Sequence, residues 1–226
     1  MADLLDTLRT IGTARTAATY RRHGAVGDVL GVSYADLGAL QKKHRGDHAL
    51  AQQLWKSGAH EARVLATMIA DPSKTTRKEL DAWVNDVQGY PLTDALAELV
   101  AKTPLAEACM TAWMKSKDEW AASAGWRILA ALARRDDDTA EAYFEPYLES
   151  IAGRIQKAQN RVRYAMNGAL IAIGGRGGAL ETKALKVAKA IGRVEVDHGD
   201  TDCKTPEAAA YIAKLRAHKA KKTAKR

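Results

Sequence analysis

Three segments of the chain repeat one arrangement of polar and apolar positions. Each has an aromatic or charged residue in its first two positions, continues with small residues at every third or fourth position, and ends in an aliphatic run. The segments are residues 60–70, 120–133 and 162–174. A spacing of three to four residues returns to the same face of an α-helix. β-Branched residues are sparse and form no alternating, strand-like run. The pattern therefore predicts an all-helical protein.

Capping residues mark several helix boundaries. Ser33 with Asp36, and Thr76 with Glu79, each place a hydroxyl three residues before an acid, which is the pattern of a capping box. Pro91 suits the first turn of a helix. These signals predict helices that begin just after residues 33 and 76 and close to residue 90.

The expected helices are short and alternate in pairs, and two of them are predicted over residues 139–158. The similar inner helices begin near residues 60, 91, 120 and 160, a spacing of about 30–40 residues. Paired helices that repeat at this period are typical of an α-solenoid of the HEAT type. We therefore predict an all-α, α–α superhelix, curved and with a concave face of a size to hold DNA, as a single domain over residues 1–212.

Composition argues against several classes of protein. No run of about 18 apolar residues occurs, so no membrane-spanning helix is expected. The amino-terminal residues are acidic and amphipathic, unlike a signal peptide. Cys109 and Cys203 form no CxxC motif and indicate a reducing cytoplasm rather than a disulfide framework. We expect a cytoplasmic monomer, associated with the bacterial nucleoid if it binds DNA.

The net charge of +8 comes mostly from the carboxyl-terminal end. Residues 213–226 hold seven lysines or arginines and no acid, so the rest of the chain is close to neutral. Such a basic tail can be a nonspecific arm for nucleic acid or another anion. A solubilising, frayed chain end explains it equally well.

An aromatic residue and an acid lie one helical turn apart within residues 83–101. Tyr90 and Asp94 are four positions apart, which places the ring and the carboxylate on one face of a helix. Together they are a candidate site. An acid in the first turn can instead serve the helix dipole, and Tyr90 can instead pack in the core or at its rim.

Two stretches of the sequence resemble a known family. Residues 30–43, LGVSYADLGALQKK, and residues 52–70, QQLWKSGAHEARVLATMIA, are similar to the opening of the HEAT-like alkylpurine DNA glycosylases, the AlkC/AlkD-type DNA alkylation repair proteins. The similarity covers most of residues 20–180. It implies a HEAT-like fold that binds double-stranded DNA, damaged or branched, and excises N3- or N7-alkylated purines without a cofactor.

The resemblance assigns roles to the candidate site. The Trp-Asp-x-x-Asp motif of the family falls where this chain has YPLTD. The carboxylate of the motif matches Asp94 and its first aromatic matches Tyr90, whereas its first Asp is Pro91 here. In such a family member, the carboxylate stabilises positive charge that develops on the sugar as the cationic base leaves. Each aromatic face would add about 0.5–2 kcal/mol.

Two further positions depart from the family. The arginine that grips a backbone phosphate in the family falls at Ser123, one turn before Arg127, which can substitute for it. The second tryptophan of the family's cleft falls at Gly168, which has no side chain.

Other basic and aromatic residues are candidates for contact with DNA. Charge runs are most often solvated faces, but on the concave face of a HEAT solenoid they can contact phosphates. Four tryptophans are expected in the core rather than in a cleft, namely Trp83, Trp113, Trp120 and Trp126; Trp120, which opens an inner helix, is the first candidate for an exception. The candidate DNA contacts are Arg127, Arg154, Lys157, Arg161, Arg163, Lys42, Lys43, Arg45 and Trp120.

Residues 197–203 hold a histidine, three acids and a thiol. Such residues can bind a divalent metal, but the spacing matches no standard site. We interpret the segment as a capped polar loop and predict neither a metal nor a cofactor.

Three functions remain open. The chain can excise alkylated purines, it can be a non-catalytic member of the same family that binds damaged or branched DNA, or it can be a HEAT-repeat scaffold for protein interactions. An enzyme should expose Asp94 beside an aromatic ring, a DNA-binding protein should present a basic face, and a scaffold should present an apolar or mixed-charge groove.

Overall fold

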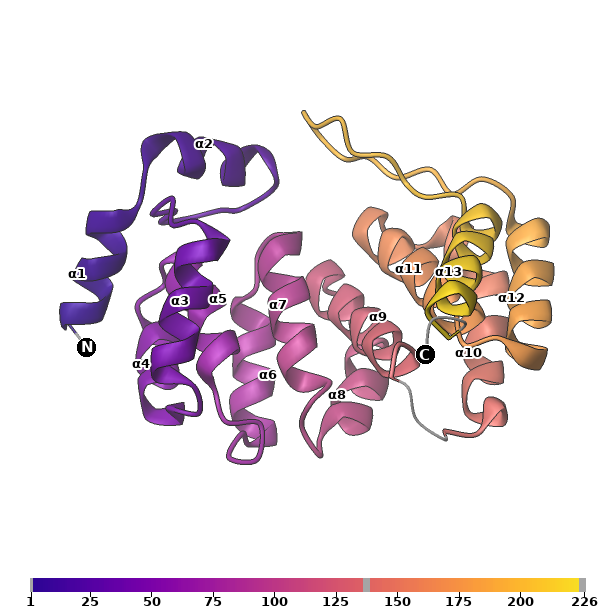
Figure 1. Ribbon diagram of the computed structural model, residues 1–226, viewed down its shortest axis with the longest axis horizontal. Helices are drawn as coiled ribbons and strands as arrows, with labels where there is room; N and C mark the ends of the chain where they lie inside the picture. The colour runs from indigo at the N-terminus through magenta and orange to yellow at the C-terminus, as the bar shows by residue number, and fades with distance from the viewer. Residues whose placement is uncertain (1, 136–138, 224–226) are drawn as a thin grey trace. The chain divides into compact units, whose positions relative to one another are not determined.

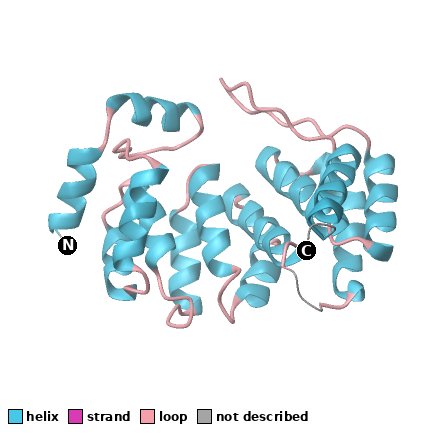
Figure 2. Ribbon diagram, viewed as in Figure 1, coloured by secondary structure: helices cyan, strands magenta, loops and turns pink. Residues whose placement is uncertain are grey.

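The computed structural model describes residues 2–135 and 139–223. Helices and loops account for all of these residues, and none of them is in a strand (Figure 2). The helices fall into two compact units. The first unit extends to Trp113 and includes Gly199–Thr201, and the second contains the other described residues. The prediction of an all-α protein is confirmed.

The first unit is built from helices α1 to α8, which follow one another in the order of the chain (Figure 1). Helix α5 is its centre, because α1, α3, α4 and α7 all pack against it. Helix α6 packs against both α7 and α8. The helices are α1 (Ala2–Ile11), α2 (Ala14–Arg22), α3 (Tyr34–His44), α4 (His48–Lys56), α5 (His60–Ile69), α6 (Arg77–Asp86), α7 (Tyr90–Val100) and α8 (Ala106–Trp113).

The second unit is organised around two long helices that lie side by side, α9 and α11. Helix α10 packs against α12, and α13 covers α11 and α12. The elements are α9 (Glu119–Ala133), α10 (Glu141–Arg154), a 3₁₀ turn (Ile155–Lys157), α11 (Asn160–Gly174), α12 (Gly178–Ile191) and α13 (Ala208–Thr223).

The predicted inner helices are the buried ones. Most residues of α5, α9 and α11 are buried, and alanine and glycine are frequent among them. Small side chains let helix backbones approach closely, which explains how α9 and α11 pack along their length. The core placement of three tryptophans is also confirmed, since Trp83, Trp113 and Trp126 are at most 5% exposed.

The helix starts follow the sequence signals. The Thr76 hydroxyl accepts a hydrogen bond from the backbone N–H of Glu79, whose carboxylate reaches back to the N–H of Thr76, so the capping box is complete. Ser33 caps α3 by accepting a hydrogen bond from the N–H of Asp36 at 3.2 Å. Pro91 occupies the first turn of α7, where the missing N–H removes no helical hydrogen bond.

The two helices predicted over residues 139–158 are one long α-helix and one short 3₁₀ turn. A single helix, α10, runs through Pro146 and is followed only by the 3₁₀ turn. Proline removes one hydrogen bond from the helix interior. Burial of Phe144, Leu148 and Ile151, which share one face of α10, offsets this loss.

Most of the predicted basic tail lies on a helix. Helix α13 extends to Thr223, and residues 224–226 of the tail lie outside the described residues. The assignment of residues 1–212 to a single domain and of the tail to a separate role remains a prediction. In the part of the chain that the structure describes, no helix has the length and apolar character needed to cross a membrane.

The two cysteines should differ sharply in reactivity. Cys109 on α8 is fully buried, and burial raises the pKa of its thiol to about 11, whereas Cys203 is exposed. Because thiolate is the reactive form, about one Cys109 side chain in a thousand would be ionised at pH 8. We expect iodoacetamide at pH 8 to label Cys203 alone in the native protein and both cysteines in guanidinium. Mass spectrometry of the labelled peptides measures this, and native labelling of Cys109 at the rate of Cys203 would contradict it.

Candidate functional site

Tyr90 and Asp94 lie in the first two turns of α7, on one side of the helix. Both side chains are half-buried, so each keeps part of its surface open to solvent. The helix follows Gly89, whose φ of 89° lies in the region that favours glycine. The Oδ1 atom of Asp94 is nevertheless buried, so only part of the carboxylate is accessible.

The end of α2 holds the ring of Tyr90. The Tyr90 hydroxyl and Nδ1 of His23 share a hydrogen bond of 2.9 Å. The ring also packs on Gly24, where an added Cβ would lie 3.3 Å from a ring carbon, and a Cβ on Gly89 would collide with the Gly24 carbonyl oxygen. The orientation of Tyr90 thus depends on the close approach of two glycine-containing loops.

Tyr34, the first residue of α3, brings a second ring to the same region. It is 52% exposed, and its ring stands edge-on to Tyr20 with centroids 5.9 Å apart. Partial burial of the phenol and the neighbouring Tyr20 raise the pKa of Tyr34, and the Asp94 carboxylate raises it further. Asp94 therefore lies close enough to act electrostatically on Tyr34. We call Tyr20, Tyr34, Tyr90 and Asp94 the tyrosine site.

A buried carboxylate fixes the loop that leads into Tyr34. Glu61 on α5 has no exposed surface and accepts hydrogen bonds from three backbone N–H groups. The donors are Leu30, Gly31 and Val32, at 2.8, 2.6 and 3.3 Å. Charge-assisted bonds of this kind offset the cost of burying a carboxylate. The position of Tyr34, two residues after Val32, depends on this anchor.

Two contacts hold the ring of Tyr20 within the tyrosine site. The Tyr20 hydroxyl donates a hydrogen bond of 3.0 Å to the carbonyl oxygen of Val32. The His60 ring lies 6.2 Å from that of Tyr20. Burial lowers the pKa of His60, and the charge of Glu61 opposes this only in part. His60 is therefore a neutral ring at pH 7.

The tyrosine site combines aromatic faces with a carboxylate at a partly exposed surface. Aromatic faces stack on nucleobases and attract cations. A carboxylate beside them can stabilise positive charge on a bound group. These are the chemical properties that the candidate pair Tyr90 and Asp94 was expected to have, now extended by Tyr34 and Tyr20.

Three of the predicted DNA contacts lie away from this site. Lys42, Lys43 and Arg45 are exposed at the carboxyl-terminal end of α3, whereas Tyr34 begins that helix. Lys42 follows Tyr34 by eight residues, which corresponds to about 12 Å along the helix axis. The structure does not bring these cations together with Asp94.

In the second unit, Ser123 takes part in helix packing. It is 3% exposed, and its hydroxyl lies 3.3 Å from the backbone oxygen of Arg161, to which it donates a hydrogen bond. The Glu119 carboxylate accepts a hydrogen bond of 2.7 Å from the N–H of the same residue. Both contacts tie α9 to the start of α11. A phosphate-binding arginine could not replace Ser123 without disrupting this packing.

Two predicted DNA contacts of the second unit are engaged with the protein itself. The Arg127 guanidinium lies over the ring of Tyr164, 5.2 Å from its centroid. Arg163 donates hydrogen bonds to the carbonyl oxygens of Glu195 and Ala158, at 2.8 and 3.0 Å. Arg163 therefore holds the loop that follows α12.

The remaining candidates differ in exposure. Arg154 and Lys157 are exposed at the end of α10 and in the 3₁₀ turn, while Arg161 and Trp120 are half-buried near the starts of α11 and α9. Gly168 lies on α11, where an added Cβ would meet no atom within 4 Å. The position of the family's second tryptophan is thus open space in this unit.

The polar segment at residues 197–203 makes contacts within the protein. Asn160 both donates to the Asp197 carbonyl oxygen and accepts from the Asp197 N–H, each at 2.8 Å. His198 lies 3.0 Å from the Thr205 hydroxyl and edge-on to Tyr164. Burial lowers the pKa of His198, and the charge of Arg161 lowers it further. Over residues 2–135 and 139–223, no three acids, histidines or cysteines are arranged to hold a metal ion.

Sequence reasoning missed the partners of Tyr90 and Asp94. The sequence marks Tyr34 only as part of a predicted helix start, and it gives no signal for His23 or Tyr20. Glu61 carried a usable signal, because it is an acid in the first turn of a helix, α5, that is mostly apolar from Val64 to Ile69. Such an acid needs hydrogen-bond donors from another segment, and the glycine-containing loop at residues 27–31 supplies them.

Comparison with known proteins points to one family. The model of a family described as DNA alkylation repair enzyme matches residues 4–212. Uncharacterized protein Lin0241 of Listeria innocua and uncharacterized protein Lmo0209 of Listeria monocytogenes are each 31% identical to this chain over 221 residues, covering 95% of this chain and 96% of theirs.

A solved structure also matches closely. It has a TM-score of 0.88 and 27% sequence identity, over 96% of this chain and 94% of that chain. It is described as representing a new family of proteins related to the HEAT-like repeat DNA glycosylases, with affinity for branched DNA structures. The likeness confirms the HEAT-like repeat fold.

Proposed function

Because the chain belongs to the DNA alkylation repair enzyme family, we propose that it binds DNA and recognises branched or damaged sites through the tyrosine site. One observation carries the proposal: Tyr34 is 52% exposed beside Tyr20 and close to Asp94. An exposed ring is a stacking platform, and bases at a branch point or lesion offer the unstacked faces that such a platform binds. The affinity of the structural relative for branched DNA supports the proposal.

The contacts of the second unit favour recognition over turnover. Ser123 is buried in helix packing, and Arg127 lies against Tyr164. An enzyme that excises a base must hold the backbone in register with its carboxylate, and a misplacement of about 1 Å can cost 100-fold in rate. Binding tolerates a looser fit, because stacking and phosphate contacts are less demanding in geometry.

The proposal predicts that Tyr34→Ala weakens binding to a three-way DNA junction about 10-fold or more. Stacking of one base on an aromatic side chain contributes about 1–3 kcal/mol, which corresponds to this range. Fluorescence anisotropy of a labelled junction, measured at several salt concentrations, gives the affinity.

Tyr211→Ala is the matched control, because Tyr211 on α13 is also an exposed tyrosine, at 41%. It should leave junction affinity within about twofold. Equal losses in the two variants would remove the tyrosine site from DNA recognition. Absence of DNA binding by the wild type at low salt would leave only the scaffold function.

Excision of alkylated purines is the second candidate. It is favoured by one observation, the half-buried position of Asp94 one turn after Tyr90. This carboxylate would stabilise the positive charge on the sugar as the alkylated base departs. Tyr90 and Tyr34 would contribute aromatic faces to the same cation.

A further inference from the structure

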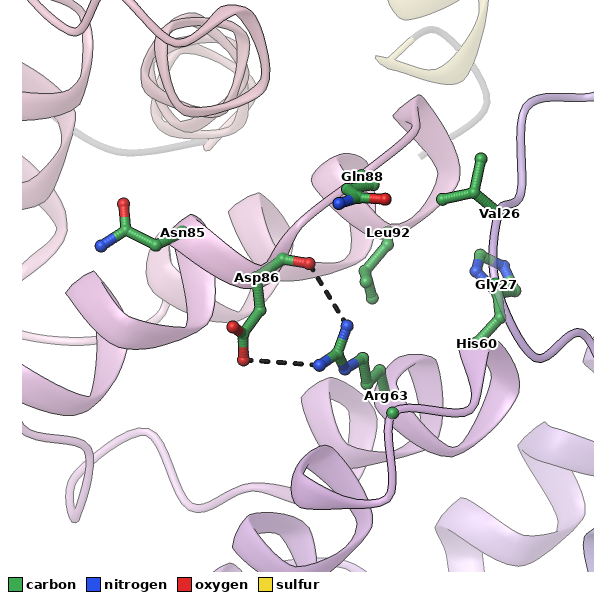
Figure 3. Close-up of a pocket in the computed structure, with 9 residues that line it drawn as sticks. Val26, Gly27, His60, Arg63, Asn85, Asp86, Gln88 and Leu92 are labelled. Atoms are coloured by element: carbon green, nitrogen blue, oxygen red, sulfur yellow. Dashed lines mark hydrogen bonds and ion pairs between the residues drawn. The ribbon is translucent and has the colours of Figure 1, made fainter.

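A pocket of about 250 Å³ lies within the first unit (Figure 3). Leu92 lines it from α7, on a different face of the helix from Tyr90 and Asp94. His60, which lies beside Tyr20, lines it from α5. The other side chains that the argument uses are Val26, Arg63, Asn85, Asp86 and Gln88.

The charged groups of the pocket neutralise each other. The Arg63 guanidinium is 3.4 Å from the Asp86 carboxylate and donates a hydrogen bond of 3.2 Å to the Asp86 carbonyl oxygen, as Figure 3 shows. Trp55 fixes the pair, since its indole N–H donates to Asp86 at 2.9 Å and its ring lies under Arg63. A phosphate in the pocket would face the Asp86 carboxylate, so the charges favour a neutral ligand.

Two carboxamides at the pocket remain available to a ligand. Neither Asn85 nor Gln88 makes a hydrogen bond with the described part of the chain, and both are exposed. By contrast, Gln41 and Gln52 bond to protein groups at 3.2 and 3.0 Å. Each carboxamide offers two donors and an acceptor. The pocket can therefore read a ligand edge that presents both donors and acceptors.

The size and the walls of the pocket favour a flat ligand. A volume of about 250 Å³ is below the roughly 300–1,000 Å³ of pockets that hold drug-sized molecules. Leu92 and Val26 supply apolar contact, and the neutral His60 ring supplies an aromatic edge. A single heteroaromatic ring system fits these properties, and nucleobases combine such a ring with a donor–acceptor edge.

We propose that this pocket receives one unpaired nucleobase of the bound DNA, with Asn85 and Gln88 hydrogen-bonding its edge. The inference rests on the proposed DNA binding and adds a second contact to the tyrosine site. Moving an unpaired base at a branch point out of the helix costs little free energy, because no base pair has to be broken. The stacking surface and the pocket would then bind different bases of one junction.

The test uses a three-way junction with unpaired 2-aminopurine at the branch point and a distant anisotropy label. One titration then reports binding by anisotropy and the environment of the base by 2-aminopurine fluorescence. For the wild type we expect both signals to change together. For Asn85→Ala/Gln88→Ala we expect at least half of the fluorescence change to be lost and affinity to fall about 10-fold, as expected when hydrogen bonds to a base are removed.

Gln53→Ala is the matched control, because Gln53 is an exposed carboxamide on α4 outside the pocket. It should behave as the wild type, and thermal unfolding of both variants checks that the fold is intact. A junction with an abasic site in place of the 2-aminopurine should bind the wild type and the double variant equally well.

The outcomes separate the two proposals. If the wild type binds the junction but the double variant and Gln53→Ala give the same affinity and the same fluorescence change, the pocket inference is overturned and DNA binding stays in place. No anisotropy change for the wild type would overturn both. Tight binding of free 2-aminopurine riboside, with no fluorescence change at the junction, would assign the pocket to a free nucleoside instead. If inorganic phosphate, added at constant ionic strength, abolishes the 2-aminopurine fluorescence change, the pocket binds an anion and the inference is also overturned.

Discussion

Replacing Glu61 with alanine is expected to lower the free energy of unfolding by about 3–5 kcal/mol, since a buried donor left without an acceptor costs about 1–3 kcal/mol. The substitution deprives the N–H groups of Leu30, Gly31 and Val32 of their common acceptor. Relaxation of the loop keeps the total below the full sum for three donors. Urea unfolding followed by circular dichroism measures the change.

Two further variants test whether the loss of stability comes from the three hydrogen bonds to Glu61 or from the loss of any carboxylate. Glu61→Gln keeps one acceptor oxygen and should lose less than Glu61→Ala. Glu119→Ala removes a carboxylate that accepts from a single described backbone N–H, that of Arg161, and should cost only about 1 kcal/mol. Losses of the same size in Glu61→Ala and Glu119→Ala would contradict the role of the three converging donors.

The same anchor links stability to the tyrosine site. The loop that Glu61 holds enters α3 at Ser33, and Tyr34 follows immediately. A variant that loosens the loop should therefore also weaken junction binding, even though Glu61 itself has no exposed surface. Sequence position alone would not suggest this link, because Glu61 and Tyr34 belong to different helices.

The helices were predictable because their signals are local. A capping hydroxyl such as that of Thr76 acts within four residues, and Pro91 determines only its own turn. The buried faces of α5, α9 and α11 follow from a repeat of three to four residues. At Pro146 the balance is the opposite, because tertiary burial of the α10 face outweighs a local helix-breaking residue.

The site was predictable only in part because its geometry is not local. Spacing along one helix was enough to pair Tyr90 with Asp94. No spacing rule brings His23 to Tyr90 or Glu61 to Gly31, since these contacts join segments that are 67 and 30 residues apart. The positive charge of Arg163 made it a candidate DNA contact, but its guanidinium donates hydrogen bonds to carbonyl oxygens of its own chain.

Asp94→Asn is expected to have the largest effect on chemistry if the protein excises alkylated purines. The substitution keeps the size of the side chain and removes its negative charge, so a developing sugar cation loses its nearest anion. Removing one such preorganised electrostatic group lowers catalytic rates by about 100- to 1,000-fold. Release of 7-methylguanine or 3-methyladenine from methylated duplex DNA, followed in single-turnover conditions, measures the rate.

Glu98→Gln is the matched control for Asp94→Asn, because Glu98 is an exposed acid one turn further along α7 and its replacement changes the net charge equally. Both variants should bind DNA slightly more tightly, since each removes a negative charge that repels phosphates. Only Asp94→Asn should lose base release. Equal rates in the two variants would show that Asp94 is not the catalyst. No release by the wild type, with junction binding intact, would reject excision and leave recognition of branched DNA as the function of the tyrosine site.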